Sequence, residues 1–96
     1  MQINKEVKKE SFAVRLSAQA GGVEVWRIWV YVLQNDLHQE PWAHLEDLFV
    51  DEAHRNQGLG SKLLIAAVDE AKKYGCYKVI FTTSHAKSTN KAWYAK

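Results

Sequence analysis

The sequence predicts an α/β protein with a mixed sheet, whose elements follow in the order β-β-β-α-β-α. Three observations carry this prediction: period-two alternation and long apolar runs in the first half, helical periodicity between Gly58 and Gly75, and a short apolar stretch after that helix. A strand–helix–strand unit implies a right-handed crossover between parallel strands. With 96 residues, the chain makes a single domain, residues 1–96.

The first half predicts a hairpin and then a third strand. Apolar residues alternate with polar or small ones from Phe12 to Ala18, and Gly21-Gly22 suits a tight turn. The next stretch, "VEVWRIWVYVLQND", is apolar on both faces, which predicts a central strand with covering layers on each side. One face carries Trp26, Ile28, Val30 and Val32, and the other Val25, Trp29, Tyr31 and Leu33. Beyond a loop containing Pro41, "WAHLEDLFV" predicts the third strand.

The second half predicts a helix, a strand and a closing helix. The first helix begins near Gly58, and Gly75 stands where a left-handed C-terminal cap is expected. A three-to-four spacing links Leu59, Leu63, Ala66, Ala67 and Glu70, and the stripe is widened by Leu64, Val68 and Ala71. The stretch "YKVIFTT", residues 77–83, predicts the fourth strand. A last helix is expected to open at Ser88 or Thr89 and to include Trp93 and Tyr94.

Composition excludes several classes of function. The net charge is only +2, without a run of five like charges, so no nucleic-acid partner is expected. No apolar run reaches bilayer-spanning length, and the single cysteine, Cys76, fits a reducing compartment. These features predict a soluble cytoplasmic protein with no membrane partner. The histidines are scattered without metal-ligand spacing, so no metal is expected: His38, His44, His54 and His85.

A loop rich in glycine stands where the first helix must begin, in "VDEAHRNQGLGSKLL". A helix start leaves backbone N–H groups unpaired, and glycine lets a ligand approach them closely. A dinucleotide fingerprint needs glycine where Leu63 stands, and a P-loop needs glycine directly before lysine, where Ser61 stands instead. The remaining pattern, Arg55-x-x-Gly58-x-Gly60, suits a pyrophosphate. A glycine-rich turn that merely joins two elements is also compatible with this spacing.

Three ordered stretches resemble the GNAT superfamily of N-acetyltransferases. The stretch "LEDLFVDEAHRNQGLGSKLL" is similar to the family's acetyl-CoA signature, "YKVIFTT" follows the helix, and "NKAWYAK" holds an Asn and an aromatic–Tyr pair. The resemblance runs from His44 through Lys96 and implies a GNAT-like acyl-CoA N-acyltransferase fold, with the acetyl-CoA-binding core in residues 42–96. The wording "LEDLFV" looks most like the diamine and polyamine acetyltransferase branch.

The resemblance implies an acetyl-CoA-dependent N-acetyltransferase that moves an acetyl group to a primary amine by direct attack in a ternary complex. The acceptor is a small-molecule amine, such as a polyamine, or an amine of a protein. Tyr94 matches the family's general-acid position, and we favour this role over a core aromatic one because a phenol carries its own proton at neutral pH. Acetyl-CoA is implied to contact the strand before the loop, the loop itself and the closing segment. The matching residues are Leu48, Phe49, Val50, Arg55, Asn56, Gln57, Gly58, Leu59, Gly60, Ser61 and Asn90.

The acceptor amine must lose a proton before it attacks, because an alkyl ammonium has a pKa of about 10.4. Glu46 is the candidate base, and an exposed strand carboxylate is an equally good interpretation. Alternation places Glu46 on one face with His44, Leu48 and Val50, and Asp47 on the opposite face. His44 is a second candidate base, and Asp47 is expected to have a structural role or to contact the acceptor.

The chain lacks two parts of the family pattern, the N-terminal helices and the C-terminal strands. This leaves a very short member, a fragment, or a chain completed by another chain. The alternative to an enzyme is therefore a non-catalytic CoA-binding module or subunit completed by a partner chain, and an unrelated interaction protein is a third interpretation. Without a later strand beside it, "YKVIFTT" would be an open apolar edge, so we expect a homodimer.

Overall fold

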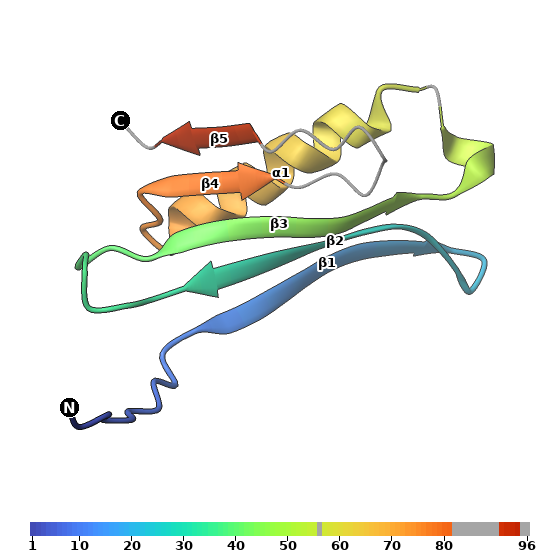
Figure 1. The fold of residues 1–96 in the computed structure, drawn as a ribbon. Helices are drawn as coiled ribbons and strands as arrows, with labels where there is room; N and C mark the ends of the chain where they lie inside the picture. The colour runs from blue at the N-terminus through green and yellow to red at the C-terminus, as the bar shows by residue number, and fades with distance from the viewer. Residues whose placement is uncertain (56, 82–90, 95–96) are drawn as a thin grey trace.

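The computed structural model describes residues 1–55, residues 57–81 and the backbone of residues 91–94. These residues form one five-stranded sheet in the order β1-β2-β3-β4-β5, with a helix against one face (Figure 1). Only β3 and β4 pair in parallel among the described strands, so the predicted mixed sheet is confirmed. The elements are β1 (Phe12–Ala20), β2 (Val23–Leu33), β3 (Trp42–Val50), the short 3-10 helix η1 (Glu52–His54), α1 (Leu59–Lys73), β4 (Lys78–Phe81) and β5 (Lys91–Tyr94).

The hairpin of β1 and β2 forms as predicted. Ala20 pairs with Val23, so Gly21 and Gly22 alone make the turn. Their φ angles are 60° and 80°, and a two-residue turn with both residues at positive φ matches the twist of the strands that it joins. The turn fixes the register of the long pair that supports the rest of the sheet.

Helix α1 crosses from the end of β3 to the start of β4 and buries its apolar stripe on β2 and β3. Leu63, Ala67 and Ala71 are at most 4% exposed, and beneath them lies the fully buried Leu45 of β3. Ala66 was expected in this stripe but is exposed, because the i, i+4 row rather than the i+3 row faces the sheet. A Leu45→Ala change would therefore destabilise the fold by about 2–5 kcal/mol.

The C-terminal cap of α1 is confirmed. Gly75 has a φ of 79°, and its N–H donates to the carbonyl of Lys72 at 3.0 Å. The N–H of Cys76 donates to the carbonyl of Ala71 at 3.3 Å. These two bonds make a Schellman motif, which ends the helix and turns the chain toward β4.

The second face of β2 differs from the prediction. Ile28, Val30 and Val32 lie under α1, whereas Trp29 and Tyr31 on the other face are only half-buried. No helix in the described part of the chain covers this face, so the expectation of covering layers on both sides is wrong there. We call this surface the open face; it carries Arg15, Arg27, Trp29, Tyr31, His44, Glu46 and Phe49.

The end of the chain also differs. Lys91–Tyr94 was expected in a helix but forms β5, which pairs antiparallel with β4 through Phe81↔Lys91 and Lys78↔Tyr94 (Figure 1). The apolar run of β4 offers backbone groups that an adjacent strand can pair with, and this preference outweighs the local helical pattern. Because β5 covers the edge of β4, the structural reason given for a homodimer no longer holds, and the dimer stays a prediction.

Candidate functional site

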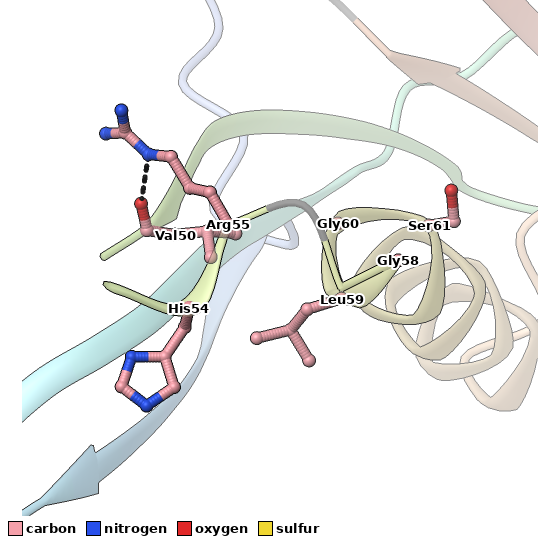
Figure 2. A pocket seen from close by; sticks show the side chains of 7 residues that line it. All are labelled: Val50, His54, Arg55, Gly58, Leu59, Gly60 and Ser61. Carbon is pink, nitrogen blue, oxygen red and sulfur yellow. Dashed lines mark hydrogen bonds between the residues drawn. The ribbon is translucent and has the colours of Figure 1, made fainter. Parts of the chain in front are cut away.

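A pocket lies at the N-terminal end of α1, where the chain leaves β3 (Figure 2). Its volume is about 290 Å³, and it is lined by Val50, His54, Arg55, Gly58, Leu59, Gly60 and Ser61. All of these except His54 were predicted as acetyl-CoA-binding residues from the sequence. The structure therefore brings the end of β3, the arginine and the glycine loop together around one cavity.

Backbone hydrogen bonds shape the turn that forms this pocket. The N–H of Asp51 donates to the carbonyl of Val25 in β2 at 2.7 Å, which ties the end of β3 to the sheet. The N–H of His54 then donates to the carbonyl of Asp51 at 2.9 Å and closes η1. Gly58 has a φ of 70°, a conformation that glycine adopts without steric penalty, and serves as the N-cap of α1.

The first turn of α1 presents unpaired donors to the pocket. The first N–H bonded along the helix is that of Lys62, which donates to the carbonyl of Gly58 at 3.3 Å. The N–H groups of Leu59, Gly60 and Ser61 precede it and lack an intrahelical acceptor. The first turn contains no acidic residue, and the dipole of this 15-residue helix places roughly half a positive charge at its N-terminus. This end of the pocket therefore favours an anion.

Arg55 adds a fixed positive charge. Its Nε donates to the carbonyl oxygen of Val50 at 2.9 Å, as the dashed line in Figure 2 shows. This bond uses one edge of the guanidinium, and the two terminal nitrogens remain available as a fork that matches phosphate oxygens. The last residue of β3 thus sets the position of the arginine.

The described part of β4 ends at Phe81, before β3 reaches the pocket. Strand β4 pairs only with Ala43, His44 and Leu45, so the Glu46–Val50 part of β3 has no β4 partner among the described residues. The predicted ligand residues Leu48, Phe49 and Val50 lie in this part, which leads directly to the pocket. Backbone N–H and C=O groups on that side of β3 are therefore placed to pair with an extended ligand.

A β-bulge interrupts the alternation of β3. Trp29 pairs with Glu46 and Arg27 with Phe49, so Asp47 and Leu48 together oppose Ile28. Asp47 has a φ of 59°, the only positive φ of a non-glycine residue in the described part of the chain. A bulge shifts every later side chain to the other face of the sheet.

Because of the bulge, three residues lie on a different face from the one predicted. His44 and Glu46 share the open face as expected, with Nε2 and Oε1 3.4 Å apart. Leu48 instead packs against the core, and Val50, opposite Trp26, lies on the helix side. Asp47, which was expected on the face opposite Glu46, binds Arg27 of the open face, with Nε–Oδ2 and Nη2–Oδ1 distances of 3.1 and 3.3 Å.

Ion pairs on the open face hold the bulge in place. Arg27 lies over the ring of Phe49, 4.7 Å from its centroid, and binds both Asp47 and Glu24. Desolvation alone would raise the pKa of Glu24, but hydrogen bonds from Arg27 and Arg15 outweigh it and lower the pKa. The expected structural role of Asp47 is consistent with this network.

The candidate catalytic residues are not brought together by the described backbone. The side chain of Glu46 is 46% exposed and lies where β4 ends beside β3. Tyr94 pairs with Lys78, the first residue of β4, so its backbone lies three residues, or about 10 Å, from the end of β4 at Phe81. Asn56 and Asn90 lie outside the described residues, and the acid–base roles of Glu46 and Tyr94 stay predictions. Gln57 lies in the loop but does not line the pocket.

His54 is a pocket residue to which the sequence prediction assigned no role. Its Nδ1 lies 3.2 Å from Oδ2 of Asp51, three residues earlier and across the single turn of η1. The sequence signal for this contact is the Asp-x-x-His spacing directly before Arg55, which metal-ligand spacing alone does not reveal. The imidazole is thereby held at the mouth of the anion pocket.

Within the described residues, Cys76 has a structural position, and neither a metal-ligand cluster nor a membrane-spanning helix is found. Cys76 is buried, and burial raises the pKa of its thiol, which favours the inert protonated form. In that part of the chain no three His, Cys, Asp or Glu side chains gather as metal ligands do. None of its helices is both long and apolar enough to cross a membrane.

Comparisons with known proteins agree with the fold. A glucosamine 6-phosphate N-acetyltransferase from Arabidopsis thaliana is 42% identical over 54 residues, and glucosamine 6-phosphate N-acetyltransferase 1 from Oryza sativa subsp. japonica is 49% identical over 38 residues. These matches cover 56% and 40% of this chain but only 34% and 23% of those proteins.

Solved structures give the same result. The crystal structure of glucosamine-6-phosphate N-acetyltransferase from Arabidopsis thaliana superposes with a TM-score of 0.67 at 29% identity, over 75% of this chain and 51% of that one. A Trypanosoma brucei acetyltransferase gives 0.66 at 28% identity, over 76% and 54%. The chain thus spans about half the length of these structures. Residues 9–96 match the acetyltransferase (GNAT) family, and the chain belongs to that family.

Proposed function

We propose that this protein is an acetyl-CoA-dependent N-acetyltransferase that acetylates a primary amine. The observation that carries the proposal is the pocket at the N-terminus of α1, where Arg55 and three unpaired N–H groups face one cavity at the end of β3. In a chain of the GNAT family, such an anion site is suited to bind the pyrophosphate of acetyl-CoA. Gly58 and Gly60 leave room for the phosphates to approach the backbone.

The remainder of the cosubstrate would follow β3. In this arrangement the pantetheine arm lies along the Glu46–Val50 segment, on the side where the described β4 does not pair with it, and the thioester lies near the end of β4 at Phe81. A backbone N–H of Leu48, Phe49 or Val50 would then stabilise the oxyanion of the tetrahedral intermediate. This geometry brings the reacting carbonyl close to Glu46, which extends from the same strand.

The proton transfers would use two side chains. Glu46 accepts the proton of the acceptor ammonium, directly or through a water, because an alkyl amine with a pKa of about 10.4 is almost entirely charged at neutral pH. Its neighbour His44, at 3.4 Å, is the second candidate base. Tyr94 donates a proton to the departing thiolate in the mechanism implied by the family resemblance, and its position in β5 makes this role the less supported of the two.

The acceptor is a primary amine of two candidate classes. The relatives named above act on glucosamine 6-phosphate, an amino sugar phosphate. The stretch "LEDLFV" instead resembles the diamine and polyamine branch. A panel containing glucosamine 6-phosphate, glucosamine, putrescine and spermidine separates these classes, since the first carries an anion and the last two carry extra cations.

The alternative function is a non-catalytic CoA-binding module completed by a partner chain. It is favoured by the separation of the two candidate catalytic residues, because Tyr94 pairs with the first residue of β4, whereas Glu46 lies beside the end of that strand. Isothermal titration calorimetry with acetyl-CoA tests binding, and release of CoA thiol in the presence of each amine tests transfer. Binding with amine-dependent thiol release supports the enzyme. Binding without release by any amine supports the module, and no binding refutes both.

A further inference from the structure

We infer that His54 is a second, titratable phosphate ligand of the acetyl-CoA pocket, so that protonation of its imidazole strengthens cosubstrate binding. The inference rests on the proposed function. It starts from the position of the ring: His54 lines the same cavity as Arg55 and the glycine turn, and Figure 2 shows the two side chains extending in different directions from the loop. Two such groups suit a ligand with phosphates at more than one place, and CoA carries a pyrophosphate and a 3′-phosphate.

The contact with Asp51 decides what the ring can offer a ligand. A carboxylate only accepts hydrogen bonds, so the 3.2 Å contact with Oδ2 of Asp51 requires the proton of a neutral imidazole to sit on Nδ1. The other nitrogen, Nε2, then presents a lone pair, which repels a phosphate oxygen. When the ring is protonated, Nε2 becomes a charged N–H donor and attracts the same oxygen.

Asp51 is itself held firmly, which keeps the ring in place. Its N–H is bonded to Val25 at 2.7 Å, and its carbonyl accepts the N–H of His54 at 2.9 Å. The imidazole is 40% exposed, so it exchanges protons with solvent and remains accessible to a ligand. His54 is therefore a positioned side chain rather than a freely rotating surface residue.

The charged groups around His54 determine how protonation of its imidazole affects the binding of an anion. Asp51 and Glu52 in and before η1 are negative, Arg55 is positive, and the first turn of α1 from Leu59 to Ser61 carries no charged side chain. Asp51 and Glu52 do not line the pocket, so with a neutral imidazole Arg55 supplies its one charged side chain among the described residues. Protonation of His54 adds a second positive charge, so binding of a phosphate and binding of the proton favour each other.

The test measures acetyl-CoA affinity by calorimetry at pH 6, 7 and 8, for the parent chain and for His54→Gln. We expect the parent to bind about three- to tenfold more weakly at pH 8 than at pH 6, the size expected for a partly exposed charge-assisted hydrogen bond. His54→Gln removes this loss. The second ionisation of a phosphate monoester, near pH 6, acts in the opposite direction because it increases the negative charge of the ligand.

Two controls complete the test. His38→Gln makes the same chemical change at a histidine that contacts Tyr77, far along the chain from the pocket, and should keep the pH dependence of the parent. Calorimetry at pH 7 in two buffers of different ionisation enthalpy should show proton uptake on binding by the parent but not by His54→Gln. Dephospho-acetyl-CoA identifies the contact: a retained pH effect assigns His54 to the pyrophosphate, and a lost one assigns it to the 3′-phosphate.

The outcomes separate this inference from the proposed function. Equal pH dependence and equal proton uptake in the parent and in His54→Gln, with tight acetyl-CoA binding in both, would overturn the role of His54 and leave the acetyl-CoA site intact. Absence of acetyl-CoA binding by the parent at pH 6 would instead overturn the site itself.

Discussion

A methyl group at position 60 should strengthen the fold and weaken acetyl-CoA binding at the same time. Gly60 lies in the first turn of α1, its φ is not positive, and a Cβ built there meets no protein atom within 4 Å. Gly60→Ala therefore introduces no strain and gains helix propensity of about 0.5 kcal/mol at this terminal position. For a domain of this size, that gain corresponds to a rise in Tm of about 2–4 °C.

The same methyl group projects where a phosphate must approach the backbone. A hydrogen bond from a backbone N–H to a charged oxygen contributes about 1.5–3 kcal/mol. Losing one such bond in Gly60→Ala lowers the affinity for acetyl-CoA by about 10- to 100-fold. Thermal unfolding followed by circular dichroism gives the first quantity and calorimetry gives the second. An unchanged Kd in a stabilised Gly60→Ala protein would refute the placement of the pyrophosphate.

Three further variants calibrate the result. Gly58→Ala puts a side chain at a φ of 70° and should lower stability by about 1–2 kcal/mol as well as weaken binding. Gly58→Val, which adds a branched side chain, should abolish binding in the folded protein. Ala66→Gly, at an exposed position of the same helix, should lower stability by about 0.5–1 kcal/mol and leave the Kd for acetyl-CoA unchanged.

Three other predictions concern the chemistry and the core. Glu46→Gln should reduce turnover most at neutral pH and regain activity as the acceptor amine deprotonates; a pH–rate profile parallel to that of the parent would contradict the base. Tyr94→Phe should keep acetyl-CoA affinity and lower kcat about 10²–10⁴-fold if Tyr94 donates a proton, and an unchanged kcat would leave the phenol without a catalytic role. Because burial raises the pKa of the Cys76 thiol above its unfolded value, the free energy of unfolding should fall as the pH rises above the ordinary thiol range near 8.5, a loss absent in Cys76→Ala.

Local patterns predicted the elements whose stability is local. Gly21-Gly22 and Gly75 take the positive φ angles that their turn and cap positions require, and both ends of β3 match the stretch "WAHLEDLFV". The pocket was also predictable, because Arg55, Gly58 and Gly60 are close in sequence and one strand-to-helix turn brings them together. Such features depend on few distant contacts.

The predictions were wrong where contacts between residues distant in the sequence determine the structure. Residues 91–94 have a helical pattern, but β4 offers them a ladder of backbone hydrogen bonds, and no single-sequence period reveals that neighbour. The open face of β2 was predicted to be covered because Trp29 and Tyr31 are apolar, yet large aromatic side chains also stabilise one another on a half-exposed sheet, where these two rings stack 6.0 Å apart.

The bulge in β3 explains how one strand carries the candidate base Glu46 on one face and lines the anion pocket with Val50 on the other. With strict alternation, the side chain of Val50 would lie on the open face with Glu46. The end of β3 would then be turned over, and with it the Val50 carbonyl that positions Arg55. The extra residue at Asp47 turns Leu48 into the core and brings Val50 to the helix side, beside the glycine turn. A φ of 59° is unfavourable by about 1–2 kcal/mol for an L-residue, although aspartate tolerates it better than most. Arg27 offsets part of this strain through its bonds to Asp47 and its position over Phe49, so the open face stabilises the geometry that the pocket on the other side requires.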